Sequence, residues 1–471
     1  MARQRYDLLV VGGGIYGASL LLAAAQLGLR AALVERADFG GGTSWNSLRI
    51  LHGGLRYLQS ADLRRFLQSV RERRRYARSF PELIEPLRCV MPLYRTCLKR
   101  RSVLRAALAM NDLGSLHRNR GVSRQLRIPR GTTLDAKDTL ELCPLLRREG
   151  LEGAAVWTDY RMLSSERILI EMLRWAVEEG AYAANYVAAE DLLAGDGKIV
   201  GLAVRDVLSG ERLQLHAGIV VNCAGPAAQL VADQWDGTQA RMSPPSLAFN
   251  LLLNRELPCQ EALAVGPAGA SAPVLFAVPQ GATTLAGTAH LSRPPGTQQA
   301  QPTEAEIAAF VLQLAAGLPG WGLRVEDVIR VFAGLLPATS PGSATLSKRE
   351  TIVDHGRHGG PDGLFSVSGV KFTTARDVAD QVLRQVGRLL PAGSRAPAAR
   401  RTHALAADTA SLTAVPATVE QDSQLRTVLR DCAEQESVRD LDDLLLRRTN
   451  WGARVVDIEG LRRGYAGVLT S

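Results

Sequence analysis

Residues 8–17, Leu8-Leu9-Val10-Val11-Gly12-Gly13-Gly14-Ile15-Tyr16-Gly17, decide the fold of this 471-residue chain. An apolar strand predicted over residues 7–11 leads into the pattern G-x-G-x-x-G, and an apolar helix is predicted over 18–27. A second strand is predicted over 30–34 and ends at Glu35. A strand, glycine turn, helix and strand within about 30 residues predict a βαβ unit that binds a dinucleotide.

The glycines of this motif have separate physical roles. Gly12 permits the tight turn, Gly14 lets the backbone approach a pyrophosphate, and Gly17 allows the helix to pack closely on the strand. The first turn of the helix then offers amide donors and the positive end of a dipole. Glu35 lies where a carboxylate can accept hydrogen bonds from an adenosine ribose. This unit alone does not distinguish NAD from FAD.

Composition limits the class of protein. A chain of 471 residues with 46% hydrophobic content predicts two or three domains, or two interleaved ones. Aromatic content of 5% and the lack of a recognised motif argue against nucleic-acid binding. None of the six cysteines forms a C-x-x-C pair, so we expect reduced thiols and no metal site. Neither a membrane span nor a signal peptide is indicated, and we expect a cytoplasmic protein.

The basic charge is concentrated in one segment. Residues 61–130 hold 18 Lys/Arg and 5 Asp/Glu, whereas the whole chain has a net charge of only +9. A charged helix is predicted over 62–80, with Leu63, Phe66, Leu67 and Val70 on one face. Arginines interleaved with apolar side chains suit an anionic membrane surface, so we expect peripheral contact with the inner face of the cytoplasmic membrane. A solvated, arginine-rich helix is the alternative.

Four further stretches carry a resemblance to a known family. Residues 42–58, GTSWNSLRILHGGLRYL, resemble the FAD-dependent glycerol-3-phosphate dehydrogenases of the D-amino-acid-oxidase-like superfamily. VNCAGP at 221–226, GVKFTT at 369–374 and DLDDLLLRRT at 440–449 are similar to later segments of the same family, in the same order. The resemblance spans nearly the whole chain.

The resemblance implies an α/β fold, in which a Rossmann-like FAD-binding domain interleaves with a mainly antiparallel β-sheet substrate domain and a small helical C-terminal region follows. It also implies oxidation of glycerol 3-phosphate to dihydroxyacetone phosphate, with electrons passed from FAD to a quinone. A homodimer is left open. The expected boundaries are 1–80, 150–235 and 345–390 for the FAD-binding domain, 81–149 for a basic, membrane-facing insertion, 236–344 for the substrate domain, 391–420 for a linker and 421–471 for the helical region.

The site residues follow from the motifs and the resemblance together. His52 is the expected base for the alcohol proton, because an imidazole has a suitable pKa; a loop histidine bonded to backbone is the alternative. An arginine can bind an anionic substrate, and a lysine can stabilise developing negative charge. The expected catalytic residues are His52, Arg56, Arg349 and Lys371, and the expected substrate contacts are Arg56, Tyr57, Arg349 and Lys371. The expected FAD contacts are Gly12, Gly14, Ile15, Tyr16, Gly17, Glu35, Arg36, Thr43, Ser44, Ser47, Leu51, His52, Gly53, Gly54, Val187, Ala224, Gly225, Gly369, Lys371, Phe372 and Thr373.

The chain departs from the family at the substrate end. Leu336 stands where the family usually has a phosphate-binding arginine. A histidine expected near Leu247 and Ala248 is missing, and His290 stands where aspartate is common. Losing a charge-assisted contact weakens the assignment of a phosphorylated substrate. An oxygen-using oxidase of an amino acid or hydroxy acid, and a non-catalytic flavoprotein docked on a membrane, therefore remain as alternatives.

Overall fold

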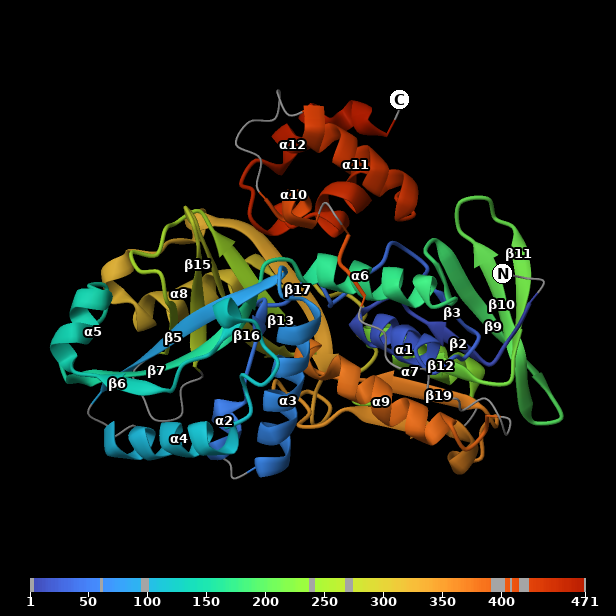
Figure 1. Ribbon diagram of the computed structural model, residues 1–471, viewed down its shortest axis with the longest axis horizontal. Helices are drawn as coiled ribbons and strands as arrows, with labels where there is room; N and C mark the ends of the chain where they lie inside the picture. Colours follow the sequence, from blue (N-terminus) through green and yellow to red (C-terminus); the bar gives the residue numbers. More distant parts are fainter. Residues whose placement is uncertain are drawn as a thin grey trace.

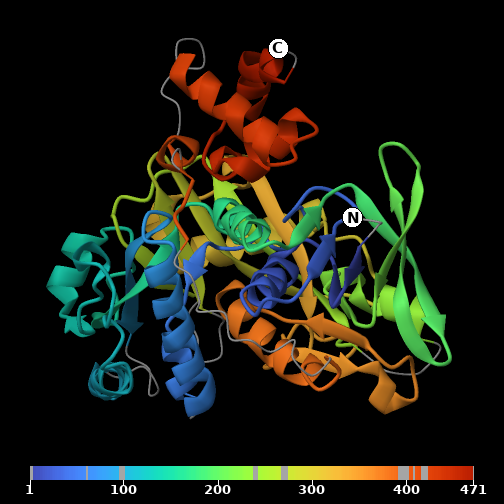
Figure 2. The same cartoon turned by 45° about the vertical axis from the view of Figure 1, so that its right-hand side comes forward.

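The computed structural model describes residues 4–59, 62–94, 101–236, 242–266, 274–390, 403–406, 409–414 and 423–469. Two β-sheet bodies lie side by side, and a C-terminal helical unit sits across their upper edge (Figures 1 and 2). The helix between the two bodies is α3 (Leu63–Ser79).

A six-stranded sheet forms the cofactor-binding body, in the order β18-β19-β12-β2-β3-β8, with every pair parallel except β18–β19. Successive side chains of β2 point to opposite faces, so Leu8 and Val10 enter one core and Leu9 and Val11 enter another. Both faces are therefore buried, which explains why the strand is apolar throughout. The strands are β2 (Leu8–Val11), β3 (Ala31–Val34), β8 (Tyr182–Ala184), β12 (Val220–Asn222), β18 (Thr351–Asp354) and β19 (Leu364–Ser368).

Helices and a second, small sheet enclose this body. Helix α1 (Ile15–Ala25) packs between α6 (Ser165–Glu178) and α9 (Ala375–Val386) on one side. On the other side lie α7 (Ala228–Trp235) and a four-stranded sheet in the order β1-β11-β10-β9. Its strands are β1 (Arg5–Tyr6), β9 (Val187–Gly195), β10 (Lys198–Asp206) and β11 (Arg212–Ala217), and β10 and β11 form an antiparallel hairpin.

The second body is built on a nine-stranded, mainly antiparallel sheet, in the order β17-β13-β16-β15-β14-β5-β7-β4 with β6 beside β7. Helix α8 (Glu304–Gly317) packs on it, with Phe310 against Phe249. Strands β5 and β7 come from segments that we expected in the insertion and in the FAD-binding domain. The strands are β4 (Ile50–Leu51), β5 (Ile84–Tyr94), β6 (Thr132–Leu134), β7 (Leu151–Met162), β13 (Pro245–Leu253), β14 (Ala262–Val265), β15 (Leu275–Gln280), β16 (Thr283–Ser292) and β17 (Val328–Pro337).

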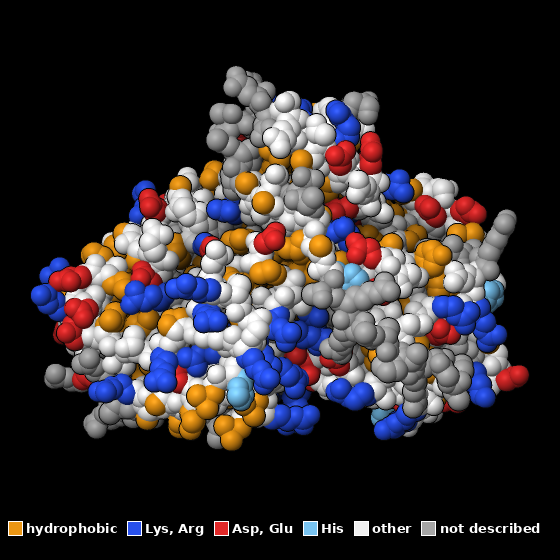
Figure 3. Space-filling model, viewed as in Figure 1, with side chains coloured by type: hydrophobic (Ala, Val, Ile, Leu, Met, Phe, Trp, Pro, Cys, Tyr) orange, Lys and Arg blue, Asp and Glu red, His pale blue; other side chains and the backbone are white. Residues whose placement is uncertain are grey.

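The basic segment folds into α3 and α4 (Arg101–Gly114), followed by α5 (Ala136–Leu142). The predicted apolar face of α3 is divided, because Phe66 and Val70 are buried whereas Leu63 and Leu67 are exposed. Phe66 packs against Gly114 at the end of α4, and a Cβ atom there would lie 2.5 Å from its ring. Figure 3 shows apolar side chains gathered over this lower edge of the molecule, with Lys and Arg above them.

The C-terminal unit has its own apolar core, centred on Leu429, Leu444 and Trp451. It comprises α10 (Thr409–Thr413), α11 (Ser423–Gln435), a helical segment over Asp443–Arg448 and α12 (Ile458–Tyr465). Helix α10 lies within the segment that we expected to be a linker, most of which is outside the described residues. None of the described helices is long and apolar enough to cross a bilayer.

Candidate functional site

The glycine loop after β2 has the geometry that a dinucleotide needs. Gly12 has a φ of +103°, and a Cβ atom there would lie 2.6 Å from the Cys223 carbonyl oxygen. At Gly17 a Cβ atom would lie 1.9 Å from the Gly12 carbonyl oxygen, so α1 can approach the strand only with glycine there. The side chain of Glu35 accepts hydrogen bonds from the Gly13 amide (2.7 Å) and the Ala37 amide (2.9 Å). The carboxylate therefore lies at the rim of the glycine loop.

The loop over residues 42–48 closes this cradle from the other side. Ser44 Oγ accepts a hydrogen bond from the amide of Ile15, at the start of α1 (2.9 Å). Thr43 donates a hydrogen bond from Oγ1 to the Leu335 carbonyl oxygen of β17 (3.2 Å). The Ser44 hydroxyl thus stands at a helix N-terminus, where a diphosphate is stabilised by amides and by the helix dipole. The residues present fit a dinucleotide.

Other expected cofactor residues come together around the same loop. The amide of Val187 donates to the Glu35 carbonyl oxygen (2.8 Å), and Ala224 lies against Gly12. Tyr16 donates from its hydroxyl to the Lys371 carbonyl oxygen (3.0 Å), and burial raises the pKa of Tyr16. A Cβ atom on Gly369 would lie 2.1 Å from that hydroxyl, so glycine is required there. Arg36 and Gly225 are exposed, Ser47 accepts a hydrogen bond from the Arg49 amide, and Phe372 packs near Tyr76.

His52 is held at the end of β4 by a buried carboxylate. Its Nδ1 lies 3.2 Å from Oδ2 of Asp159 on β7, while 48% of the imidazole remains exposed. Asp159 also accepts hydrogen bonds from the Gly53 amide (2.7 Å), from Trp157 Nε1 (3.2 Å) and from Arg73 Nη1 (2.6 Å). Burial alone would raise the pKa of Asp159, but the His52 hydrogen bond and the Arg73 charge outweigh it and lower the pKa to about 2.

This ionisation state fixes the tautomer of His52. An ionised carboxylate can only accept hydrogen bonds, so Nδ1 of His52 carries the proton that it donates to Asp159. Nε2 of a neutral imidazole is then an acceptor. The ring also lies beside Phe276, with the ring centroids 5.4 Å apart. In its neutral form, His52 therefore presents Nε2 as an oriented and partly exposed hydrogen-bond acceptor.

Another expected catalytic residue, Lys371, is held against an aromatic ring. Lys371 Nζ lies 4.0 Å from the centroid of the buried Tyr57 ring, and Arg65 Cζ lies 4.2 Å from the same centroid. Contacts of this kind hold cations beside aromatic faces. The side chain of Arg56 is outside the described part of the chain, and that of Arg349 is exposed. The structure brings Tyr57 and Lys371 together, but gives no such contact for Arg56 or Arg349.

The positions at which this chain departs from the family lie on three adjacent strands of the antiparallel sheet, β17, β13 and β16. Leu336 of β17 is half-buried and pairs with Ser246 of β13, directly after the Leu335 carbonyl that binds Thr43. His290 of β16 is exposed and pairs with Ala248. An apolar side chain therefore stands close to the loop over 42–48, where the resemblance led us to expect an arginine.

Asp159 and Arg73 were not identified from the sequence. Asp159 lies in an ordinary amphipathic strand, and Arg73 is one of many arginines in the basic segment. The sequence signal for Asp159 is weak, a single carboxylate in the stretch VWTDY at 156–160, and nothing marks Arg73. Their roles become visible only when β4, β7 and α3 come together.

A parallel sheet with a glycine loop, roofed by an antiparallel sheet, defines a dinucleotide-binding oxidoreductase with two interleaved domains. A family model described as "DAO: FAD dependent oxidoreductase" matches residues 7–410. The chain belongs to this DAO family of FAD-dependent oxidoreductases, FAD is its cofactor, and the predicted fold class is confirmed.

Individual relatives and one solved structure show which named members of the family the chain is similar to. An alpha-glycerophosphate oxidase of Streptococcus pyogenes is 31% identical over 348 residues, covering 73% of this chain and 56% of the relative. An aerobic glycerol-3-phosphate dehydrogenase of Bacillus subtilis is 26% identical over 388 residues, covering 81% and 67%. The chain thus matches little more than half the length of the streptococcal oxidase. The crystal structure of a Bacillus halodurans glycerol-3-phosphate dehydrogenase with FAD superposes with a TM-score of 0.70 at 22% identity, covering 99% of this chain and 92% of that one.

Proposed function

We propose that this flavoprotein oxidises the secondary alcohol of glycerol 3-phosphate, or of a closely related small polyol, to the ketone. The observation that carries the proposal is the His52–Asp159 pair, in which a buried carboxylate orients the imidazole. A secondary alcohol must lose the hydroxyl proton together with the hydride, and His52 Nε2 is available for that proton. The relatives named as oxidases and dehydrogenases of this substrate support the choice.

The protein's own groups have distinct tasks in this reaction. FAD, when bound, supplies the acceptor of the hydride at its N5 atom. Asp159 keeps the imidazole of His52 in the tautomer that accepts a proton at Nε2, and it stabilises the cation that results. Lys371 stabilises negative charge that develops on the substrate oxygen. Thr43, Ser44 and Ile15 would hold the diphosphate of the cofactor when it is bound. Arg349 and Arg56 remain proposed substrate contacts.

The replacement at Leu336 bears on recognition of the phosphate group, so the experiment compares glycerol 3-phosphate with glycerol, which lacks only the phosphate, and with a hydroxy acid and an amino acid. Purified holoenzyme is mixed without oxygen with glycerol 3-phosphate, glycerol, lactate or alanine at millimolar concentration, and flavin absorbance near 450 nm is followed. We expect bleaching by glycerol 3-phosphate and slower or no bleaching by the others. Bleaching by alanine or lactate alone would favour the amino-acid or hydroxy-acid oxidase, and no bleaching by any compound would favour a non-catalytic flavoprotein.

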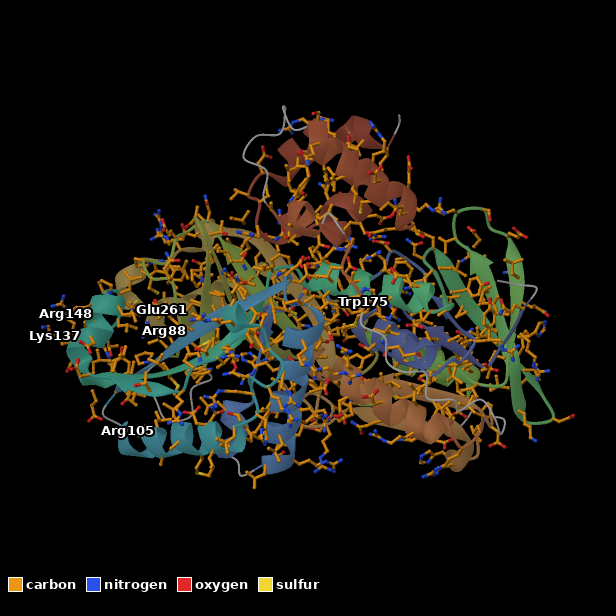
Figure 4. The ribbon with its side chains drawn as sticks, in the orientation of Figure 1. Arg88, Arg105, Lys137, Arg148, Trp175 and Glu261 are labelled. Carbon is orange, nitrogen blue, oxygen red and sulfur yellow. The ribbon has the colours of Figure 1, made fainter. Side chains whose placement is uncertain are left out.

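We also propose that a membrane quinone accepts the electrons and that α3 and α4 dock on the inner face of the cytoplasmic membrane. Five apolar side chains between 53% and 69% exposed form a patch there: Leu63, Leu67, Met110, Leu113 and Leu116. Arginines surround it, including Arg64 and Arg120, and Figure 4 shows Arg105 on α4 at this edge. Apolar groups that enter the lipid interface beside cations that attract its anionic headgroups suit such docking.

The electron acceptor can be tested separately. Substrate-reduced enzyme is mixed with a short-chain ubiquinone or with air-saturated buffer, and the return of flavin absorbance is timed. We expect fast reoxidation by quinone and slow reoxidation by oxygen. Fast reoxidation by oxygen, with stoichiometric peroxide, would make the protein an oxidase like the streptococcal relative.

A further inference from the structure

A guanidinium of the C-terminal unit lies on the cofactor-binding loop. Arg447, in the helical segment Asp443–Arg448, has its Cζ atom 4.0 Å from the centroid of the Trp45 ring. Trp45 directly follows Ser44, whose hydroxyl binds the start of α1. The edge of Phe332 supports the same indole, with the centroids 5.2 Å apart. The C-terminal unit therefore contacts the loop at Trp45, the residue next to Ser44, which binds the start of α1.

The contact extends to the backbone of the loop. A Cβ atom placed on Gly41 would lie 3.8 Å from Nε and 3.9 Å from Nη2 of Arg447. Gly42, the next residue, is exposed and has open space where its side chain would be. The guanidinium thus lies along the segment that leads into Thr43 and Ser44.

Arg447 differs from the neighbouring Arg448 in its ion pairing. Arg448 forms two hydrogen bonds to the Asp38 carboxylate, at 2.7 and 2.9 Å, and its charge is neutralised. Arg447 donates one hydrogen bond, to the Leu446 carbonyl oxygen (3.3 Å), and forms no ion pair with any residue that the structure describes. Burial lowers the pKa of Arg447, and the charges of Glu166 and Asp38 only partly offset that effect.

A partly buried cation with spare donors gains from an anionic partner. The FAD diphosphate is such an anion, and the amides at the start of α1 lie across the same loop. We propose that Arg447 is a cofactor-binding residue, whose guanidinium is held on Trp45 and binds the diphosphate of FAD together with the N-terminus of α1. The C-terminal unit is then part of the FAD site. This proposal rests on FAD binding and not on the identity of the substrate.

Binding of three ligands to the flavin-free full-length protein tests the proposal. FAD and ADP contain the diphosphate, whereas riboflavin lacks it. We expect Arg447→Gln to weaken FAD and ADP about 10- to 100-fold, as is typical for loss of a charged hydrogen bond, and to leave riboflavin unchanged. Arg463→Gln is the matched control, because Arg463 lies in the same unit and its side chain is 74% exposed.

Two results would overturn the proposal. Unchanged FAD and ADP affinities in Arg447→Gln would show that the residue only packs, and an equal loss for riboflavin would show that the loop has lost its structure. Trp45→Leu provides a second variant, should Arg447→Gln not fold. It should weaken the binding of FAD and ADP but not that of riboflavin, because the guanidinium loses the aromatic ring on which it packs. Full FAD and ADP affinity in Trp45→Leu would contradict the proposal in the same way. Turnover is not used as a readout, so failure of the substrate assignment leaves this test intact.

Discussion

The cofactor end and the catalytic end of the site are assembled differently. At the cofactor end, the glycine loop, Glu35 and Ser44 come from one short stretch of chain, and the hydrogen bonds that join them span 22 and 29 residues. At the catalytic end, His52 depends on Asp159, 107 residues later in the sequence, and Asp159 depends on Arg73 of α3. The binding loop therefore depends on residues close in the sequence, whereas the orientation of the base depends on tertiary contacts between distant segments.

The largest effect is expected at the cofactor end. Gly17→Ala should abolish FAD binding, because a Cβ atom 1.9 Å from the Gly12 carbonyl oxygen forces α1 away from the strand. The purified variant should be colourless, as measured by its absorbance near 450 nm. Gly218→Ala is the control, since a Cβ atom there meets nothing within 4 Å. A yellow Gly17→Ala protein with normal FAD content would show that the loop is not constrained as described.

At the catalytic end, the expected effect is on rate without loss of cofactor. His52→Asn should lower the rate of flavin reduction by substrate by about 10²- to 10⁴-fold, because the proton acceptor is removed. Asp159→Asn should lower it less, since His52 is kept and loses only its orienting charge, although the buried Arg73 also loses its ionic partner. FAD content should stay unchanged in both variants, and the exposed His358→Asn should behave as wild type. Normal reduction by His52→Asn would assign the proton to another group.

The Asp159 contacts also predict a dependence of stability on pH. The pKa of this carboxyl lies at about 2, below the ordinary value of 3.8, so its ionised form stabilises the fold above pH 4 and that contribution is lost as the pH falls towards 2. The full contribution is about 2 kcal/mol. In urea unfolding, the free-energy gap between wild type and Asp159→Asn should shrink by about 1 kcal/mol from pH 7 to pH 3. A gap independent of pH would mean that Asp159 does not titrate in this way.

Features that depend on residues close in the sequence could be predicted from it, whereas features that depend on contacts between distant segments could not. The βαβ unit and its glycines depend on residues close in the sequence, and they were predicted correctly. The pairing of β5 with β7 joins distant segments, so the sheet was larger than expected. The net charge of the basic segment also overstates its exposed charge. Arg73 and Arg118 are buried in ion pairs, and Arg75 pairs with Asp380 of α9. Only part of that charge faces the solvent.

The smallest effect is expected on the membrane surface. Replacing Leu113 and Leu116 with serine should reduce sedimentation with vesicles that contain phosphatidylglycerol about five- to tenfold, because less apolar surface enters the interface. Flavin reduction by substrate should be unchanged. Leu312→Ser, at a residue 71% exposed on α8, is the control. Equal binding by all proteins would remove α4 from the docking surface.

The proposed chemistry is tested most directly by isotopic substitution at the reacting carbon. Glycerol 3-phosphate carrying deuterium at C2 is mixed with the oxidised holoenzyme in an anaerobic stopped-flow instrument, and flavin bleaching is timed against the unlabelled compound. We predict complete bleaching by both compounds, several-fold slower with deuterium. Absence of bleaching, or bleaching at equal rates under conditions where hydride transfer limits reduction, would contradict oxidation at C2.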